Sequence, residues 1–377
     1  MTALPRDAAQ LGGEGARVTA ADVINGDARW ATLVGDVRET LRGVPDGCAQ
    51  TCVTSPPYFG LRDYGNAAQI GQETTPREFV DALVAVMRDV RRVLANDGTL
   101  WLNIGDSYAQ NGVSGPQGAT GERASRTFTA QGASAKPAGS AKPKDLLGIP
   151  WRLAFALQDD GWYLRSDIIW AKPNPMPESV TDRPTRAHEY VFLLTKRSRY
   201  FYDADAIRED AATGTARLSS VTPDAVRSDA RKSDRSGANG RNVQSVNAES
   251  ERRDSVGCAF NNNPRLRVTD GKRNARDVWT ITPEPCAEAH FATMPPDLAR
   301  RCILAGSRRG DIVLDPFGGA GTTALAALQH GRRALLCELN PEYVEIQRRR
   351  LADFAADTTS PIDARGADFG PLFGGVR

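Results

Sequence analysis

The sequence predicts an α/β protein with a Rossmann-like, doubly wound and mostly parallel sheet. Short apolar strands alternate with amphipathic helices from Trp30 onward, and the same alternation resumes at Asp277. A glycine-rich turn also follows the apolar strand that ends at Asp315, the position where such sheets bind nucleotides. A chain of 377 residues with 40% hydrophobic residues can bury the core that this fold needs.

The first half of the predicted sheet ends at two adjacent prolines. A β-branched run from Ala49 to Thr54 predicts a buried strand that Pro56 and Pro57 stop. Apolar residues at spacings of three and four predict a helix over 76–95, ended by the Asn-Asp-Gly turn at 96–98. The remaining elements expected here are strands at 30–34, 99–104, 166–170 and 190–194, and helices at 39–44 and 146–159.

The second half repeats the alternation around the glycine-rich turn. Expected strands cover residues 277–281, 311–315 and 333–338, and expected helices cover 296–305, 322–330 and 341–354. Since strands and helices alternate in both halves, one sheet built from both is the simplest arrangement.

Composition divides the chain into five regions. Residues 1–28 lack periodicity and are interpreted as a loose N-terminal arm, and 357–377 as a C-terminal tail. The catalytic domain is expected in two halves, 29–205 and 277–356, and the first half contains a Gly, Ala, Ser and Lys-rich insertion at about 110–144 that we interpret as mobile. Residues 206–276 carry 14 basic and 9 acidic side chains with few apolar anchors, which indicates a small inserted region that contacts nucleic acid.

Cysteine and histidine content and the absence of a long apolar run limit the class of protein. The net charge of +2 neither requires nor excludes a polyanionic partner. The 6 cysteines form no C-x-x-C pair and there are only 3 histidines, so we expect no metal site. With no signal peptide and no apolar run of transmembrane length, a cytoplasmic, nucleoid-associated protein without a membrane partner is expected.

The glycine-rich turn reads Asp-Pro-Phe-Gly-Gly-Ala-Gly-Thr-Thr from Asp315 to Thr323. Glycines allow backbone to approach a ligand closely, and the following helix presents free N–H groups. The turn does not match the G-x-G-x-x-G pattern of dinucleotide sites, but Glu338 ends the next strand, where an acidic side chain can bind both ribose hydroxyls. The pattern therefore indicates an adenosine-containing cofactor other than NAD.

A second motif, Ser55-Pro56-Pro57-Tyr58, follows the strand at 49–54. One interpretation is structural, with a rigid strand exit and a packing aromatic. The other is chemical, because a proline turn presents fixed carbonyl acceptors, Ser55 adds an acceptor, and Tyr58 offers a stacking face. A nucleobase flipped out of a duplex requires that set.

The two motifs in this order resemble the β arrangement of DNA amino-methyltransferases, in which an S/D-P-P-Y motif precedes an F-x-G-x-G motif. The resemblance extends over GTLWLNIGDSY at 98–108, the segment 170–196 that begins WAKPNPMPES, HFATMPPDLARR at 290–301 and LNPEYVEIQRRR at 339–350. It implies S-adenosyl-L-methionine as cofactor, duplex DNA as substrate, and a target-recognition element at about 206–276.

The resemblance also assigns residues by position. Catalysis falls to Ser55, Pro56, Pro57 and Tyr58. Cofactor binding falls to Asp36, Phe291, Asp315, Phe317, Gly318, Gly319, Gly321, Thr322 and Glu338. For DNA contacts we interpret Lys172, Asn174, Arg183 and Arg186 as candidates, since they lie on or near the K-P-N segment.

An exocyclic amino nitrogen is a poor nucleophile, so the expected mechanism holds it with Ser55 and the Pro56 carbonyl for direct in-line methyl transfer. Serine at the first motif position is commoner, by resemblance, among cytosine N4 enzymes, so N4 of cytosine is favoured and N6 of adenine is the alternative. Methylation at carbon 5 needs a cysteine nucleophile, and Cys286 lacks the expected context.

Two further readings stay open at this point. One is a DNA-binding protein that retains the cofactor fold without catalysis, and the other is an RNA or protein methyltransferase. A restriction endonuclease that acts on the same site is an expected partner if the enzyme belongs to a restriction pair, and a solitary enzyme is the alternative.

Overall fold

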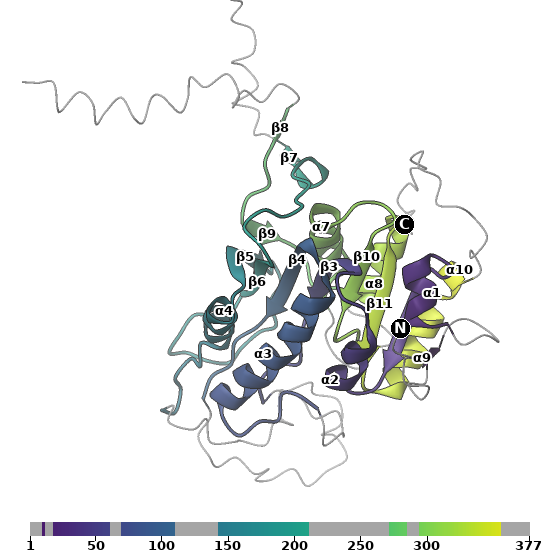
Figure 1. The fold of residues 1–377 in the computed structure, drawn as a ribbon. Coiled ribbons are helices and arrows are strands. Elements are labelled where there is room, and N and C mark those ends of the chain that lie inside the picture. Colours follow the sequence, from purple (N-terminus) through teal and green to yellow (C-terminus); the bar gives the residue numbers. More distant parts are fainter. Residues whose placement is uncertain are drawn as a thin grey trace, which may run out of the picture. The chain divides into compact units, whose positions relative to one another are not determined.

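The computed structural model describes residues 10–11, 18–60, 69–109, 142–210, 271–284 and 294–355 (Figure 1). The insertion expected at 110–144 lies outside these residues except for 142–144, and so does most of the region 206–276. The tail at 357–377 lies outside them entirely.

Strands and helices alternate along the described chain. The strands are β1 Gln10–Leu11, β2 Trp30–Val34, β3 Ala49–Thr54, β4 Leu94–Ile104, β5 Tyr163–Ala171, β6 His188–Thr195, β7 Glu209–Asp210, β8 Lys272–Arg273, β9 Val278–Thr280, β10 Ile312–Asp315 and β11 Arg333–Glu338. The α-helices are α1 Ala20–Asn25, α2 Val37–Thr40, α3 Pro76–Val93, α4 Ile149–Asp159, α7 Pro296–Gly306, α8 Thr322–Gln329, α9 Pro341–Arg350 and α10 Ala352–Ala355, and short 3-10 turns lie at Leu41–Gly43 and Asp205–Ile207.

One large sheet has the strand order β1-β2-β11-β10-β3-β4-β6-β5-β9. The block from β2 to β4 is parallel throughout, whereas β6 runs antiparallel to both of its neighbours. From β10 the chain crosses to β11 on one side, and from β3 it crosses to β4 on the other, so β10 and β3 flank the topological switch point. The predicted doubly wound, mostly parallel sheet is confirmed.

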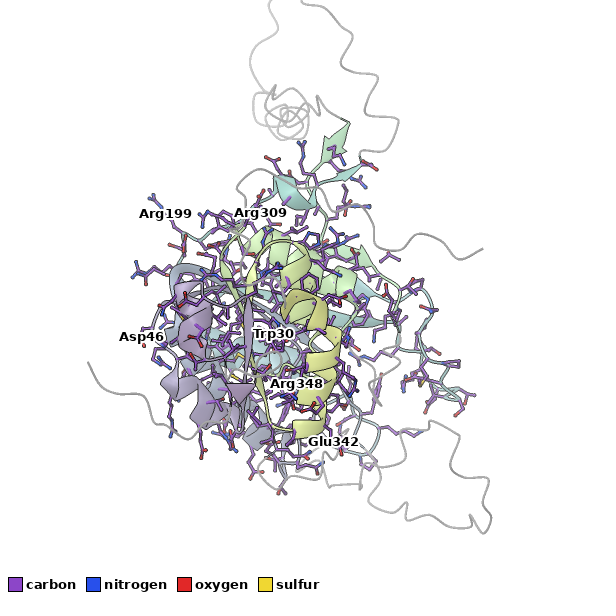
Figure 2. All side chains as sticks on the ribbon, turned by 90° about the vertical axis from the view of Figure 1, so that its right-hand side faces the viewer. Trp30, Asp46, Arg199, Arg309, Glu342 and Arg348 are labelled. Atoms are coloured by element: carbon purple, nitrogen blue, oxygen red, sulfur yellow. The ribbon has the colours of Figure 1, made fainter. Side chains whose placement is uncertain are left out.

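Helices cover both faces of this sheet. Side chains alternate between the two faces of a strand, and Leu100 and Leu102 of β4 join the core cluster that contains α1, α2, α3 and α4. On the opposite face, Trp101 lies against α7, where a Cβ added to Gly306 would come within 2.7 Å of the Trp101 indole nitrogen. Helix α7 packs against α8 (Figure 1). From α9 the charged side chains of Glu342 and Arg348 project (Figure 2).

Two expectations about the elements are wrong. Within the segment expected to be an irregular arm, α1 forms a helix because Thr19 and Asp22 make a reciprocal capping box at its start. The second error concerns residues 96–98, which were expected to form a turn between a helix and a strand. In the structure β4 begins at Leu94 and continues through these residues. A register shift between Ala49 and Thr51 of β3 accommodates the extra residues.

The chain divides into two compact units, residues 1–206 with 277–377, and residues 207–276. The first unit contains the large sheet. Of the second, the described residues form the antiparallel pair β7 and β8, in which Glu209 binds Arg273 and Arg276. No helix in the described part of the chain is long and apolar enough to cross a membrane.

Candidate active site

The two sequence motifs meet at the switch point of the sheet. Strands β10 and β3 are parallel neighbours, with Leu314 opposite Cys52, so their carboxyl ends lie at the same edge. There the Thr54 hydroxyl donates a hydrogen bond of 2.7 Å to the Asp315 carboxylate. Asp315 also accepts from the backbone N–H of Phe317 at 3.1 Å and is buried, with 3% of its surface exposed. One carboxylate therefore joins the first residue of the glycine-rich turn to the residue before Ser55.

Two glycines of the turn are required for different reasons. A Cβ on Gly318 would lie 3.1 Å from Leu336, because the turn crosses closely over β11. Gly321 has a φ of +79° and precedes α8, a conformation that side chains disfavour. A Cβ on Gly319, by contrast, would meet only the Phe317 carbonyl oxygen at 3.9 Å. The turn is thus packed on its inner side and open at Gly319.

Glu338 ends β11 beside this turn. Its carboxylate accepts hydrogen bonds from the backbone N–H groups of Gly319 at 2.7 Å and Asn340 at 2.8 Å. Burial raises the pKa of Glu338 to about 7, although both backbone bonds oppose the shift. Burial also raises the pKa of Asp315. The edge therefore holds one buried acidic side chain, Asp315, and one half-buried, Glu338, next to an open glycine turn.

Two residues of helix α9, Gln347 and Arg350, hold the glycine-rich turn by hydrogen bonds, and neither was identified from the sequence. The buried Gln347 amide donates to the Gly319 carbonyl at 2.7 Å and accepts from the Thr32 hydroxyl at 2.6 Å. Arg350 donates to the Ala320 carbonyl at 2.5 Å. The available signal was a polar residue, Gln347, on the apolar side of an amphipathic helix.

The Ser-Pro-Pro-Tyr motif leaves β3 at the same edge. Pro56 is buried, whereas Ser55, Pro57 and Tyr58 are half-buried. The Tyr58 hydroxyl donates to the Glu189 carboxylate at 2.5 Å. The motif thus follows directly after Thr54, whose hydroxyl binds the Asp315 carboxylate.

The other predicted cofactor residues differ in burial and in the partners they bind. Thr322 is buried at the start of α8, and Phe317 packs against the core cluster. Asp36 lies just after β2 at the same edge, but its carboxylate caps α2 and forms an ion pair with Arg38 at 2.5 Å. The Arg38 bonds lower the pKa of Asp36. Phe291 lies outside the described residues.

The four predicted DNA contacts all lie in the segment between β5 and β6, residues 172–187, here called the strap. Asn174 is exposed. The other three are paired with acidic groups: Lys172 with Glu189, Arg183 with Glu178 at 2.7 Å, and Arg186 with Asp106 at 3.9 Å. Because β5 runs parallel to β3 and β4, the strap leaves the sheet at the edge that carries Ser55.

A mostly parallel sheet with a glycine turn and two acidic strand ends at its switch point is the Rossmann-like arrangement that binds a nucleotide cofactor. Residues 49–349 match the N6/N4 DNA methylase family. The chain is 43% identical over 322 residues to the Type II methyltransferase M.Cfr9I of Citrobacter freundii, covering 85% of this chain and 87% of that protein. It is 42% identical over 319 residues to M.SmaI of Serratia marcescens, covering 85% and 89%.

Among solved structures, the PvuII DNA methyltransferase (cytosine-N4-specific) aligns with a TM-score of 0.50 at 18% identity, covering 88% of this chain and 93% of that one, a likeness of fold. The chain belongs to the N6/N4 DNA methylase family. It is a Type II DNA methyltransferase, and its methyl donor is S-adenosyl-L-methionine.

The residues present fit this cofactor. Its ribose offers two hydroxyl donors and its methionine part a cationic amino group, and the site offers the acceptors Glu338 and Asp315. The open side of Gly319 leaves room for a ligand against the turn. Within the described part of the chain, no group of three or more His, Cys, Asp or Glu side chains is placed to hold a metal ion.

Proposed function

We propose that the protein methylates the exocyclic N4 of cytosine within a specific site in duplex DNA, on a base extruded from the helix. The hydrogen bond between Thr54 and Asp315 carries this proposal, because it holds the proline turn against the cofactor turn. A base bound at Ser55 and a cofactor bound at Asp315 would then share one edge of the sheet. The serine at position 55 supports cytosine over adenine.

Each residue has a separate task in this scheme. The bound cofactor supplies an electrophilic methyl group on its sulfonium. Ser55 and the Pro56 carbonyl accept hydrogen bonds from the amino group, which localises the nitrogen lone pair, and Tyr58 stacks on the base. Asp315 and Glu338 hold the cofactor. The nitrogen attacks the methyl carbon directly as the carbon–sulfur bond breaks, so no covalent intermediate with the enzyme forms. S-adenosylhomocysteine leaves, and the methylated nitrogen releases one proton to solvent.

The two cysteines beside the site do not support a cysteine nucleophile. Cys52 and Cys337 are buried beside Asp315, and burial raises the pKa of both thiols, that of Cys337 to about 12. Thiols in this state are inert at neutral pH. Cys286 lies outside the described residues.

The deciding experiment incubates the purified protein with methyl-labelled cofactor and mixed-sequence duplex DNA, followed by digestion to nucleosides. Labelled N4-methylcytosine is the expected product. Labelled N6-methyladenine would keep the mechanism and overturn the choice of base. No labelled nucleoside, with intact cofactor binding, would support the non-catalytic reading, and transfer to RNA alone would overturn the DNA substrate.

Two partner proposals follow from the same assignment. The relatives M.Cfr9I and M.SmaI are named as Type II methyltransferases, which supports a restriction endonuclease that acts on the same DNA site. Residues 206–276, with their excess of basic side chains, are proposed to recognise the target sequence.

We expect cofactor affinity to weaken as the pH falls below about 7, because burial raises the pKa of Glu338 to about 7. The ribose hydroxyls donate to the ionised carboxylate, so the acid form must first lose its proton. The Kd for S-adenosylmethionine should therefore be constant above pH 7 and rise by about tenfold per pH unit below it. Calorimetric titration with S-adenosylmethionine between pH 5.5 and 7.5 measures this.

Glu338→Gln supplies the control, since it keeps the size of the side chain and removes the titration. Its Kd for S-adenosylmethionine should be higher than that of the wild type at pH 7.5. The Kd of this variant should not change between pH 5.5 and 7.5. The amino group of the cofactor is the same in both titrations and cancels in the comparison. A wild-type Kd that stays flat down to pH 5.5 would contradict a role for Glu338 in holding the ribose.

A further inference from the structure

The carboxylate of Glu189 binds side chains from three other segments, at the edge of the sheet that carries Ser55. It lies near the start of β6 and accepts hydrogen bonds from the Tyr58 hydroxyl at 2.5 Å and the Asn103 amide of β4 at 3.2 Å. Its other oxygen binds the Lys172 ammonium at the end of β5. The Glu189 side chain is only 14% exposed, so these donors replace most of its water.

The ring of Tyr58 is fixed from a second direction by Gly105. A Cβ at this buried position, directly after β4, would lie 2.7 Å from Cε2 of Tyr58 and 3.3 Å from two further ring atoms. The ring therefore rests on the bare backbone of Gly105, while its hydroxyl is held by Glu189. Two independent contacts, one on the ring and one on the hydroxyl, determine where this aromatic points.

Lys172 balances the charge of this arrangement. Its ammonium lies 4.4 Å from the centre of the Trp170 ring and binds Glu189, with 21% of the side chain exposed. An unpaired carboxylate in so enclosed a place would be costly. Asn103 adds a further donor and itself donates to the Tyr190 carbonyl at 3.2 Å. The network is thus a neutral, hydrogen-bonded support built on three strands.

We infer that Glu189 is a positioning residue for Tyr58, which it holds by the hydroxyl so that the ring presents its face to the extruded base. The inference rests on the proposed role of Tyr58 as the stacking residue. Since the hydroxyl proton is donated to Glu189, Tyr58 contributes a stacking surface to the base and does not donate a hydrogen bond to it. Lys172, whose ammonium binds Glu189, supports the same arrangement.

A double-mutant cycle tests the inference with Tyr58→Phe and Glu189→Gln. The first removes the hydroxyl, and the second keeps the size of the side chain but turns one of its two acceptor oxygens into a donor. Each single change should lower the single-turnover rate of methyl transfer by about tenfold to a hundredfold, the effect of losing a hydrogen bond to a charged group. Cofactor Kd should stay within about twofold.

The double variant decides between positioning and an independent role. If Glu189 acts through the Tyr58 hydroxyl, the double variant should be slower than the slower single variant by no more than about twofold. Rate losses that multiply would overturn the inference, as would a wild-type rate for Glu189→Gln. Glu345→Gln, on α9 where Glu345 pairs with Arg348 at the surface, is the matched control and should keep the wild-type rate.

A spectroscopic measurement tests the contact without any methylation. All 8 tyrosines are replaced by 3-fluorotyrosine, and the fluorine resonance of Tyr58 is identified by its loss in Tyr58→Phe. That resonance should shift or broaden in Glu189→Gln and stay unchanged in Glu345→Gln. An unchanged Tyr58 resonance in Glu189→Gln would overturn the inference. Absence of DNA methylation by the wild type would contradict the proposed function alone, and the resonance would still decide the role of Glu189.

Discussion

Asp315→Ala should abolish both cofactor binding and methyl transfer, with loss of activity of at least about 10³-fold. The change removes the acceptor for the buried Thr54 hydroxyl and for the part-buried Phe317 N–H. Each unsatisfied donor costs about 1 to 3 kcal/mol, so the free energy of unfolding should also fall by a few kcal/mol. Calorimetric titration with S-adenosylmethionine and urea unfolding measure the two effects.

Two further variants separate charge from architecture. Asp315→Asn retains an acceptor oxygen for both donors, so its stability should stay within about 1 kcal/mol of the wild type while its cofactor affinity falls. Asp311→Ala removes an aspartate just before the start of the same strand, where it accepts from the Arg308 N–H, and should leave activity unchanged. An Asp315→Ala protein that binds cofactor with wild-type affinity would contradict the assignment.

The strands around the site were predictable because their signals are local. The sequence interpretation matches β2, β3 and β11 in their full bounds, since each is a compact apolar or β-branched run with a clear stop. The alternation of strands and helices also predicted that the two motifs are neighbours. In a doubly wound sheet the switch point lies between the two halves of the sheet, and each motif follows a strand of one half. The structure confirms this through the pairing of β10 with β3.

The errors arise where tertiary contacts or very short signals decide. The Asn96 to Gly98 stretch has strong turn residues, yet it continues β4, and a Cβ on Gly98 would lie 3.0 Å from the Gln50 carbonyl oxygen of β3. Close packing on a neighbouring strand thus outweighs the local preference. The helix α1 has six residues and too little apolar periodicity to detect, and only its capping box at Thr19 marked it.

The support for Tyr58 was not predictable from the chain. Its parts come from β4, β5 and β6, and they converge only because the antiparallel register sets Trp170 opposite Glu189 and Ile104 opposite Tyr190. A shift of one residue would turn Glu189 to the other face of the sheet. The only signal was a charged residue at the start of an apolar strand. The register of β6 therefore places Glu189, which belongs to neither motif, beside Tyr58.

Ser55→Ala should lower the single-turnover rate of methyl transfer by about 10² to 10³-fold, the usual effect of removing one group that stabilises developing charge. Ser55 follows Thr54, which the Asp315 carboxylate holds in place, so its hydroxyl lies at the edge where the amino group must be oriented. Alanine fits the same backbone and leaves the Thr54 to Asp315 bond intact. Cofactor Kd and thermal stability should therefore match the wild type, and rapid-quench assays with labelled cofactor isolate the chemical step.

Ser55→Asp tests the chemical reason for this loss. An aspartate accepts hydrogen bonds more strongly than serine, and it completes the alternative form of the motif, so this variant should recover much of the rate lost in Ser55→Ala. The exposed Ser198, on the segment after β6, gives the matched control Ser198→Ala, which should be fully active. If Ser55→Ala transfers methyl at the wild-type rate, the amino group is oriented by the proline carbonyls alone, and serine at this position no longer supports the choice of cytosine.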